Sequence, residues 1–221
     1  MAYRKTPSVQ GRLDAAREQL VDSATAVVAE AGWSGASVTV VAAAAGMSVG
    51  SVYQHFPSKS ALAVEVFRRA SGREVRVLSE VLAHGTGDPL ERLAHGVGVF
   101  ARRALENRGL AHALLAAPAD AAVGRERLEY RRRYRAAFAR VVREGVAEGL
   151  LPSQDADVTA AALTGAIGEV LVDPLAGPGE DAAGSLVAEL VAMSLRCAGA
   201  PPAAPAGRPA GPSDDDDEGI R

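Results

Sequence analysis

The residues most suited to chemistry are hydroxyl side chains that precede short apolar segments. Ser37, Ser48 and Ser58 each occupy such a position, where a serine hydroxyl can accept hydrogen bonds from the free backbone N–H groups of a first helical turn. A helix N-terminus with such a hydroxyl can also bind a phosphate oxygen. For Ser37 and Ser48 the sequence leaves two uses open, capping alone and capping combined with phosphate contact.

The segment from Val41 to Val49 predicts two short helices joined by a sharp turn. Gly46 tolerates the left-handed backbone that ends the first helix, and Ser48 begins the second. Ala42 and Ala45 are small, so the two helices can cross closely. This pattern is typical of a helix-turn-helix. The core beneath it is expected to hold Met47, Val52 and Phe56.

A longer series of residues between 12 and 70 resembles the TetR family of bacterial repressors. The matching positions are Gly32-Trp33, Val41-Ala42, Ala45-Gly46-Met47-Ser48, Gly50, Tyr53, His55-Phe56, Lys59 and Leu62. The resemblance implies a dimeric, ligand-responsive repressor that binds duplex DNA. It also implies that the helix from Ser48 to about His55 enters the major groove, while the helix opening at Ser37 crosses the phosphate backbone.

Within that resemblance, two side chains match family residues that contact phosphates. Tyr53 would place its hydroxyl on a phosphate, and Lys59 would place its ammonium there; their alternatives are a surface aromatic and an ordinary solvated lysine. For base contacts, Gln54 can pair with adenine and Val49 can touch a thymine methyl. The candidate DNA-binding residues are Ser37, Ser48, Val49, Gly50, Ser51, Tyr53, Gln54, His55 and Lys59.

Hydrophobic periodicity predicts an all-α fold of about nine helices. Apolar residues at three- and four-residue steps indicate a first helix from Leu13 that ends near Gly32, and three short helices follow. Longer helices are predicted over 58–83, 90–105, 108–116, 120–148, 155–172 and 180–198. The change from short to long predicted helices indicates two domains. These are a helix-turn-helix domain over 11–57 and a larger helical ligand-binding and dimerisation domain over 58–198. Residues 1–10 are expected to form a flexible basic arm, and the Pro-, Ala- and Asp-rich residues 199–221 a disordered tail.

The distribution of charge is more informative than the formal net charge of −3. The tail after residue 198 carries two arginines against five acidic residues, so the remainder is neutral overall. Residues 1–70 carry seven basic and five acidic side chains, which modestly favours DNA. Thr39, Val40, Ala43 and Ala44 stand where the family often has charged or polar residues, so the N-terminal Arg4, Lys5 and Arg12 are candidates for compensating phosphate contacts.

Family layout implies a cavity for a small effector among the helices between Leu90 and Val172. Its lining should be apolar and aromatic with few polar anchors, although the same side chains also suit an ordinary bundle core. His95 and His112 are possible polar anchors. The candidate ligand-binding residues are Phe100, Leu115, Tyr130, Tyr134, Phe138, Leu163 and Ile167.

The same layout implies a homodimer formed by the helices near 155–172 and 180–198. Both segments are rich in small and aliphatic residues, which let helices approach closely. A two-fold dimer would match a palindromic operator, and a ligand that binds one arrangement of the two reading heads better would change DNA affinity.

Other classes of function find little support in the residues. The chain shows no metal-ligand spacing, phosphate loop or nucleophile elbow, so we expect no enzyme activity, no metal and no cofactor. Cys197 is the single cysteine, and neither an export signal nor a membrane span is visible, so we expect a cytoplasmic protein. Three alternatives stay open: a DNA-binding dimer without ligand, activation in place of repression, and a second nucleic-acid surface on the arginine-rich helix 120–148.

Overall fold

The computed structural model describes residues 7–116, 120–177 and 183–201, and every regular element in these ranges is a helix. This confirms the predicted all-α fold. The helices are α1 (Pro7–Gly35), α2 (Val38–Ala44), α3 (Val49–His55), α4 (Lys59–His84), α5 (Pro89–Glu106), α6 (Arg108–Leu115), α7 (Ala121–Ala147), α8 (Ala156–Ala176) and α9 (Ala183–Ala198). Residues 1–6 of the expected arm and 202–221 of the expected tail lie outside the described residues, whereas 7–10 belong to α1.

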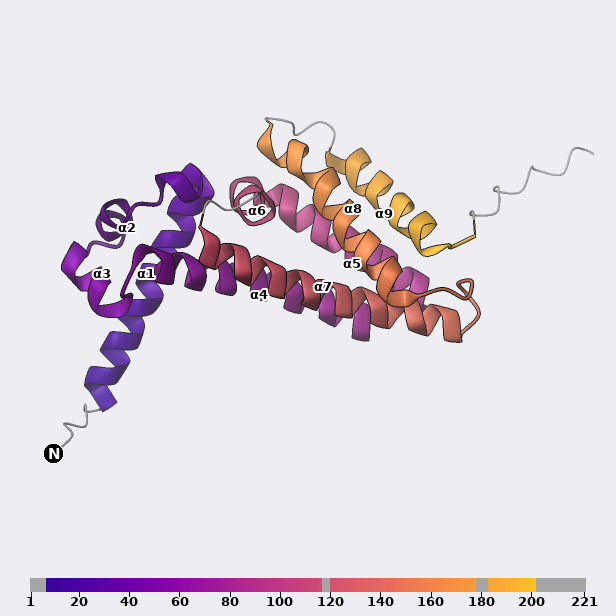
Figure 1. The fold of residues 1–221 in the computed structure, drawn as a ribbon, viewed down its shortest axis with the longest axis horizontal. Coiled ribbons are helices and arrows are strands. Elements are labelled where there is room, and N and C mark those ends of the chain that lie inside the picture. The colour runs from indigo at the N-terminus through magenta and orange to yellow at the C-terminus, as the bar shows by residue number, and fades with distance from the viewer. Residues whose placement is uncertain (1–6, 117–119, 178–182, 202–221) are drawn as a thin grey trace, which may run out of the picture.

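Helices α1 to α3 form a small group at one end of an elongated molecule, and α4 leads from it into the larger bundle (Figure 1). Helices α4 and α7 lie side by side and run in the same direction. Ser60 near the start of α4 donates a hydrogen bond to Asp120 before α7, and Arg68 further along pairs with Glu126. Helix α6 lies at the junction of the two parts, and α8 and α9 lie together on one outer side (Figure 1).

Serine caps begin α2, α3 and α4 as the sequence predicts, but only α2 and α3 are short, because α4 runs for 26 residues. The hydroxyls of Ser37, Ser48 and Ser58 accept the backbone N–H groups of residues 40, 51 and 61 at 3.2, 3.1 and 3.0 Å. Asp120 and Asp155 cap α7 and α8 in the same way. Each cap satisfies N–H groups that the helix itself leaves without acceptors.

Two helices end later than predicted. Gly32 adopts a positive φ of 64°, which breaks α1 as expected, but helical turns resume beyond this kink as far as Gly35. Helix α8 continues past Val172 and through Pro174 to Ala176. The side chain of Arg108 explains the second extension, because it donates to the carbonyl oxygens of Pro174 and Gly177 at 2.6 and 3.2 Å and satisfies the end of the helix.

The molecule has two main cores, and α4 contributes to both. Leu62 and Val66 in its first half pack with α1, α2 and α3, while Leu78 and Leu82 in its second half pack with the larger bundle. The expected domain boundary after residue 57 therefore precedes a helix that belongs to both parts. A movement of α4 against the bundle would be transmitted to the small domain.

Among the described residues, α8 is the one helix long and apolar enough to cross a membrane by composition alone. Its most apolar 18-residue stretch has a mean hydropathy of 1.4, and 28% of that stretch is buried. The buried positions, among them Leu163, Ile167 and Leu171, pack into the bundle core. Other apolar positions of this helix, such as Val158 and Val170, are exposed within the protomer.

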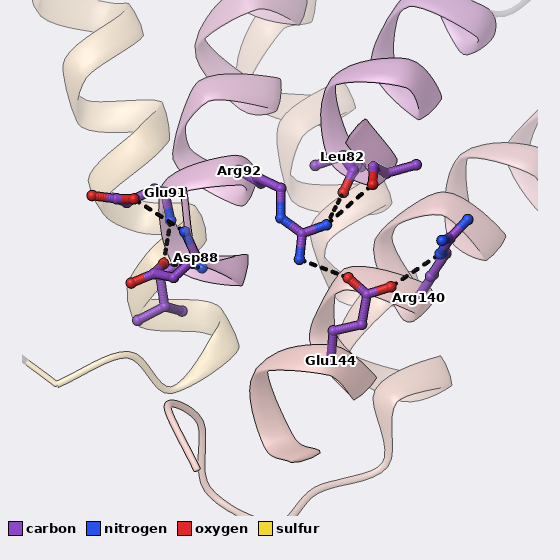
Figure 2. A network of polar contacts seen from close by, with 8 residues as sticks. Leu82, Asp88, Glu91, Arg92, Arg140 and Glu144 are labelled. Carbon is purple, nitrogen blue, oxygen red and sulfur yellow. Dashed lines mark hydrogen bonds and ion pairs between the residues drawn. The ribbon is translucent and has the colours of Figure 1, made fainter. Parts of the chain in front are cut away.

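A network of hydrogen bonds and ion pairs joins α4, α5 and α7 at the end of the bundle away from the small domain (Figure 2). Asp88 and Glu91 form a capping box at the start of α5, in which each side chain accepts a backbone N–H of the other residue. Arg92 donates to the Leu82 carbonyl at the end of α4 at 2.8 Å and to Glu144 of α7 at 2.7 Å. Three helices thus share one guanidinium, whose side chain is only 11% exposed.

Glu144→Gln is expected to destabilise the protein at neutral pH and much less in acid. Burial raises the pKa of Glu144, but hydrogen bonds from Arg92 and Arg140 outweigh burial and hold it below the ordinary value of 4.5. The carboxylate therefore stabilises the fold above pH 4.5, and this contribution is lost as the pH falls through the folded-state pKa. Urea unfolding should show a loss of about 1–3 kcal/mol at pH 7.

The same urea titration at pH 3 should bring the variant and the wild type together. Glu80→Gln, at an exposed position on α4, is the matched control and should have little effect at either pH. An equal loss of stability at pH 3 and pH 7 for Glu144→Gln would contradict the prediction.

Candidate nucleic-acid interface and ligand cavity

The turn between α2 and α3 has the hydrogen bonds of a Schellman motif. Gly46 has a φ of 64°, its N–H donates to the Ala43 carbonyl at 3.0 Å, and the Met47 N–H donates to the Ala42 carbonyl at 2.9 Å. The positive φ is the reason that glycine is required here. These bonds fix the angle at which α3 leaves α2.

The inner side of this turn is packed as predicted except at Met47, which is only partly buried at the edge of this core. Ala42, Ala45, Val52 and Phe56 are buried, with 3% or less of each exposed. The structure adds Gln19 of α1, whose side-chain amide donates to the Ala45 carbonyl at 2.9 Å. No local pattern marks Gln19, because its partner lies 26 residues away. The helix-turn-helix is therefore anchored to α1 by both packing and a hydrogen bond.

The outer side of α3 brings the candidate DNA-binding residues together on one surface. Tyr53 is 52% exposed and Val49 is 38% exposed, and both belong to α3. Ser48, Gly50, Gln54 and Lys59 are exposed as well, while Ser37, Ser51 and His55 are partly exposed. Helix α3 carries no acidic residue, so nothing on it repels a phosphate. The surface offers hydroxyl, amide and ammonium donors in a short span.

The serine hydroxyls on this surface already have protein partners. Ser48 Oγ lies 3.0 Å from Ser51 Oγ in addition to capping α3. On α1, Glu18 and Asp22 pair with Arg69 at 2.7 and 3.2 Å. Arg17 pairs with Glu65 at 3.0 Å and lies over the Phe56 ring at 4.9 Å. These acidic side chains are neutralised by the scaffold, away from α3.

A cavity of about 530 Å³ lies where α1, α4, α5, α6, α7 and α8 meet. Its lining includes six of the seven predicted ligand-binding residues: Phe100, Leu115, Tyr130, Tyr134, Phe138 and Ile167. Leu163 is the exception and is fully buried in the bundle core. Its helix turns Thr164, Gly165 and Gly168 toward the cavity instead, which a count of apolar residues does not reveal. His95 and His112 are not part of the lining.

The middle of the cavity has polar groups set in an apolar wall. Tyr134 packs edge-to-face on Phe100, with ring centroids 5.6 Å apart, and its hydroxyl has no hydrogen-bond partner among the described residues. Burial, and to a lesser extent the charge of Glu74, raises the pKa of Tyr134 well above its usual range, so it remains a neutral donor. Glu74 and Arg103 form a two-bond ion pair beside it at 2.7 and 2.8 Å. The sequence analysis did not identify this pair, whose members lie on α4 and α5.

At the end of the cavity nearest α1 the lining is cationic. Arg127 and Arg131 stand one turn apart on α7. Arg127 donates to the carbonyls of Leu115 and Ala116, which end α6. Burial lowers the pKa of Arg127, and the neighbouring charge of Arg131 lowers it further.

Helix α6 connects the cavity to the small domain. Leu110, Ala111 and Leu114 line the cavity, and Trp33 of α1 donates its indole N–H to the Ala113 carbonyl at 2.7 Å. Asp22 and Thr25 of α1 are part of the cavity wall themselves. A molecule in the cavity therefore touches the helix that anchors the helix-turn-helix.

Comparison with known proteins agrees with this geometry. The family model for bacterial regulatory proteins of the tetR family matches residues 20–66, and the model for a tetracyclin repressor-like C-terminal domain matches residues 86–171. The HTH-type transcriptional repressor DhaR of Mycobacterium sp. (strain GP1) is 36% identical over 77 residues. That match spans 35% of this chain and 39% of DhaR.

Solved structures share the fold over nearly their whole length. The transcriptional regulator FadR from Bacillus subtilis, in complex with stearoyl-CoA, is 18% identical with a TM-score of 0.70 and covers 80% of this chain and 96% of its own. SmeT in complex with triclosan is 21% identical with a TM-score of 0.71, and the match covers 88% of this chain and 99% of SmeT. Both family models and the shared architecture lead to one conclusion: the chain belongs to the TetR family and is a transcriptional regulator.

Proposed function

We propose that this protein is a repressor that binds a palindromic operator as a homodimer and is released by a small effector. The observation that carries the proposal is the shared helix: α1 holds the DNA-reading turn through Gln19 and also contributes Asp22 and Thr25 to the cavity wall. A repressor of this kind acts in the cytoplasm without catalysis. The nine residues from Ser37 to Lys59 named above are its proposed DNA contacts.

The proposed dimer is formed by the uncovered faces of α8 and α9. Val158 is 66% exposed and Val170 is 40% exposed, although α8 is among the most apolar segments of the chain. Exposed small residues on both helices, such as Ala162 and Ala188, leave room for close helix contact. A second copy would cover this surface symmetrically and place two α3 helices for the two halves of an operator.

The proposed effector occupies the cavity between the two parts. FadR from Bacillus subtilis was solved with stearoyl-CoA and SmeT with triclosan, so two proteins with this fold bind small molecules that have a large apolar part. Phe100, Tyr134, Phe138 and Ile167 offer a matching apolar wall here. Ligand binding changes DNA affinity only if the ligand prefers one arrangement of α1, α4 and α6 over another.

Two substitutions in the reading surface are expected to separate positioning from base recognition. Lys59→Gln should weaken binding to all operators and reduce the slope of log K against log salt by about 0.9 per protomer, because one phosphate contact is lost. Gln54→Ala should leave the slope unchanged and alter preference at one base pair of each half-site by about 1–3 kcal/mol. Mobility-shift titrations with the protein's own promoter DNA at several salt concentrations measure both.

Arg76→Gln provides the control for lost charge, since Arg76 is exposed on α4 well beyond the reading surface. Its salt slope should equal that of the wild type. A wild-type slope in Lys59→Gln would refute the phosphate contact, and absence of any operator binding by the wild type would refute the proposed function.

A further inference from the structure

Two partly buried guanidinium groups of the cavity wall have no carboxylate partner in the described part of the chain. Arg127 and Arg131 both line the cavity and both are only partly exposed. The other cationic groups of the wall differ: Arg69 pairs with Glu18 and Asp22, Arg103 pairs with Glu74, and Arg73 is exposed. The remaining carboxylate of the wall, Glu169, is exposed on α8. Positive charge therefore concentrates at Arg127 and Arg131.

Arg127 is held in place rather than free to turn into solvent. Its guanidinium donates to the last carbonyls of α6, from Leu115 and Ala116. Arg131 follows at i+4, where side chains of a helix are neighbours and like charges repel. Partly buried like charges are unfavourable, and an anion bound between them would remove this cost through charge-assisted hydrogen bonds.

The cavity extends away from these arginines along an apolar wall. Helices α4 and α7 run in the same direction: Phe67 packs on Tyr130 at one end of the cavity, one turn from Arg127 along α7, and Leu78 shares the bundle core with Phe138 at the other. Phe67 and Leu78 are separated by about 16 Å at the helical rise of 1.5 Å per residue. An occupant that fills the cavity is therefore elongated, charged at one end and apolar at the other.

We propose that the cavity binds an elongated apolar molecule with one anionic head, a carboxylate or phosphate, held by Arg127 and Arg131 beside the C-terminus of α6. The inference rests on the proposed function, because it specifies the chemistry of the effector. The apolar chain lies along Phe100, Phe138 and Ile167. The unpartnered Tyr134 hydroxyl supplies a neutral donor midway.

Calorimetric titration of the full-length protein without DNA tests the charge preference with four probes of equal chain length. Wild type should bind dodecanoate and dodecyl phosphate on the order of tenfold or more tightly than dodecanol, and dodecylammonium most weakly. Arg131→Gln should remove most of the preference for the anions and leave dodecanol affinity unchanged. Arg131→Glu should invert the charge preference, so that dodecylammonium binds more tightly than the anions. Dodecanol binding in each variant shows that the cavity has folded.

Arg135→Gln is the matched control, because Arg135 is exposed one turn further along α7 and does not line the cavity. It should bind all probes as the wild type does. Equal wild-type affinity for dodecanoate and dodecanol, or no binding of any probe, would overturn the inference. A mobility-shift assay keeps the two proposals apart: operator binding without anion preference refutes only the ligand class, whereas no operator binding refutes the repressor function itself.

Discussion

Replacing Ala162 by Arg is expected to convert the dimer into a monomer and to lower operator affinity on the order of 100-fold or more, because two linked reading heads bind far more tightly than one. Ala162 is exposed on the outer face of α8, one helical turn after the exposed Val158 and one turn before Gly165 and Ala166. A guanidinium at this place would be desolvated against the partner copy without a carboxylate to receive it.

Sedimentation velocity measures the change of mass, and mobility-shift titration measures the loss of affinity. Because the side chain points to solvent within the protomer, helical content by circular dichroism should be unchanged. Ala136→Arg makes the same replacement at an exposed position on α7 and should remain dimeric. A dimeric Ala162→Arg protein with normal operator affinity would show that α8 does not form the interface.

Replacing Gly109 by Ala is expected to destabilise the protein by about 1–3 kcal/mol through overpacking. A Cβ at Gly109 would lie 1.9 Å from the Ala29 carbonyl oxygen, which is backbone and cannot rotate away. Helices α1 and α6 would have to move apart, and the hydrogen bond from Trp33 to Ala113 spans this contact. The melting temperature should fall by several degrees, since each kcal/mol is worth about 2–4 °C at this size.

Gly124→Ala is the control with the opposite expected sign. Gly124 lies in α7, and a Cβ there would meet nothing within 4 Å. Alanine should therefore stabilise the helix by about 0.5–1 kcal/mol. Scanning calorimetry of both variants distinguishes the steric effect from the general effect of removing glycine. A Gly109→Ala protein as stable as the wild type would show that α1 and α6 separate without cost.

The reading turn illustrates what local sequence predicts well. The caps at Ser37 and Ser48 and the turn at Gly46 are formed by hydrogen bonds between residues three to five positions apart. Their roles can therefore be predicted from the neighbouring residues in the sequence. The helix ends at Gly32 and Pro174 were predicted less well. There the chain continues because of contacts that a local pattern does not contain, such as Arg108 reaching the end of α8.

Nine helices, the serine caps of α2 to α4 and the helix-turn-helix could be derived from the sequence alone for the described residues, because helical periodicity and capping are short-range properties. The tertiary structure decided the rotation of α8, which turns Leu163 into the core and Thr164 toward the cavity. It also decided which charges are neutralised: Glu74 pairs with Arg103, 29 residues away, while Arg127 and Arg131 have no carboxylate partner within the described ranges. Such pairings depend on which helices meet in space, and a residue's own neighbours in the chain do not determine that.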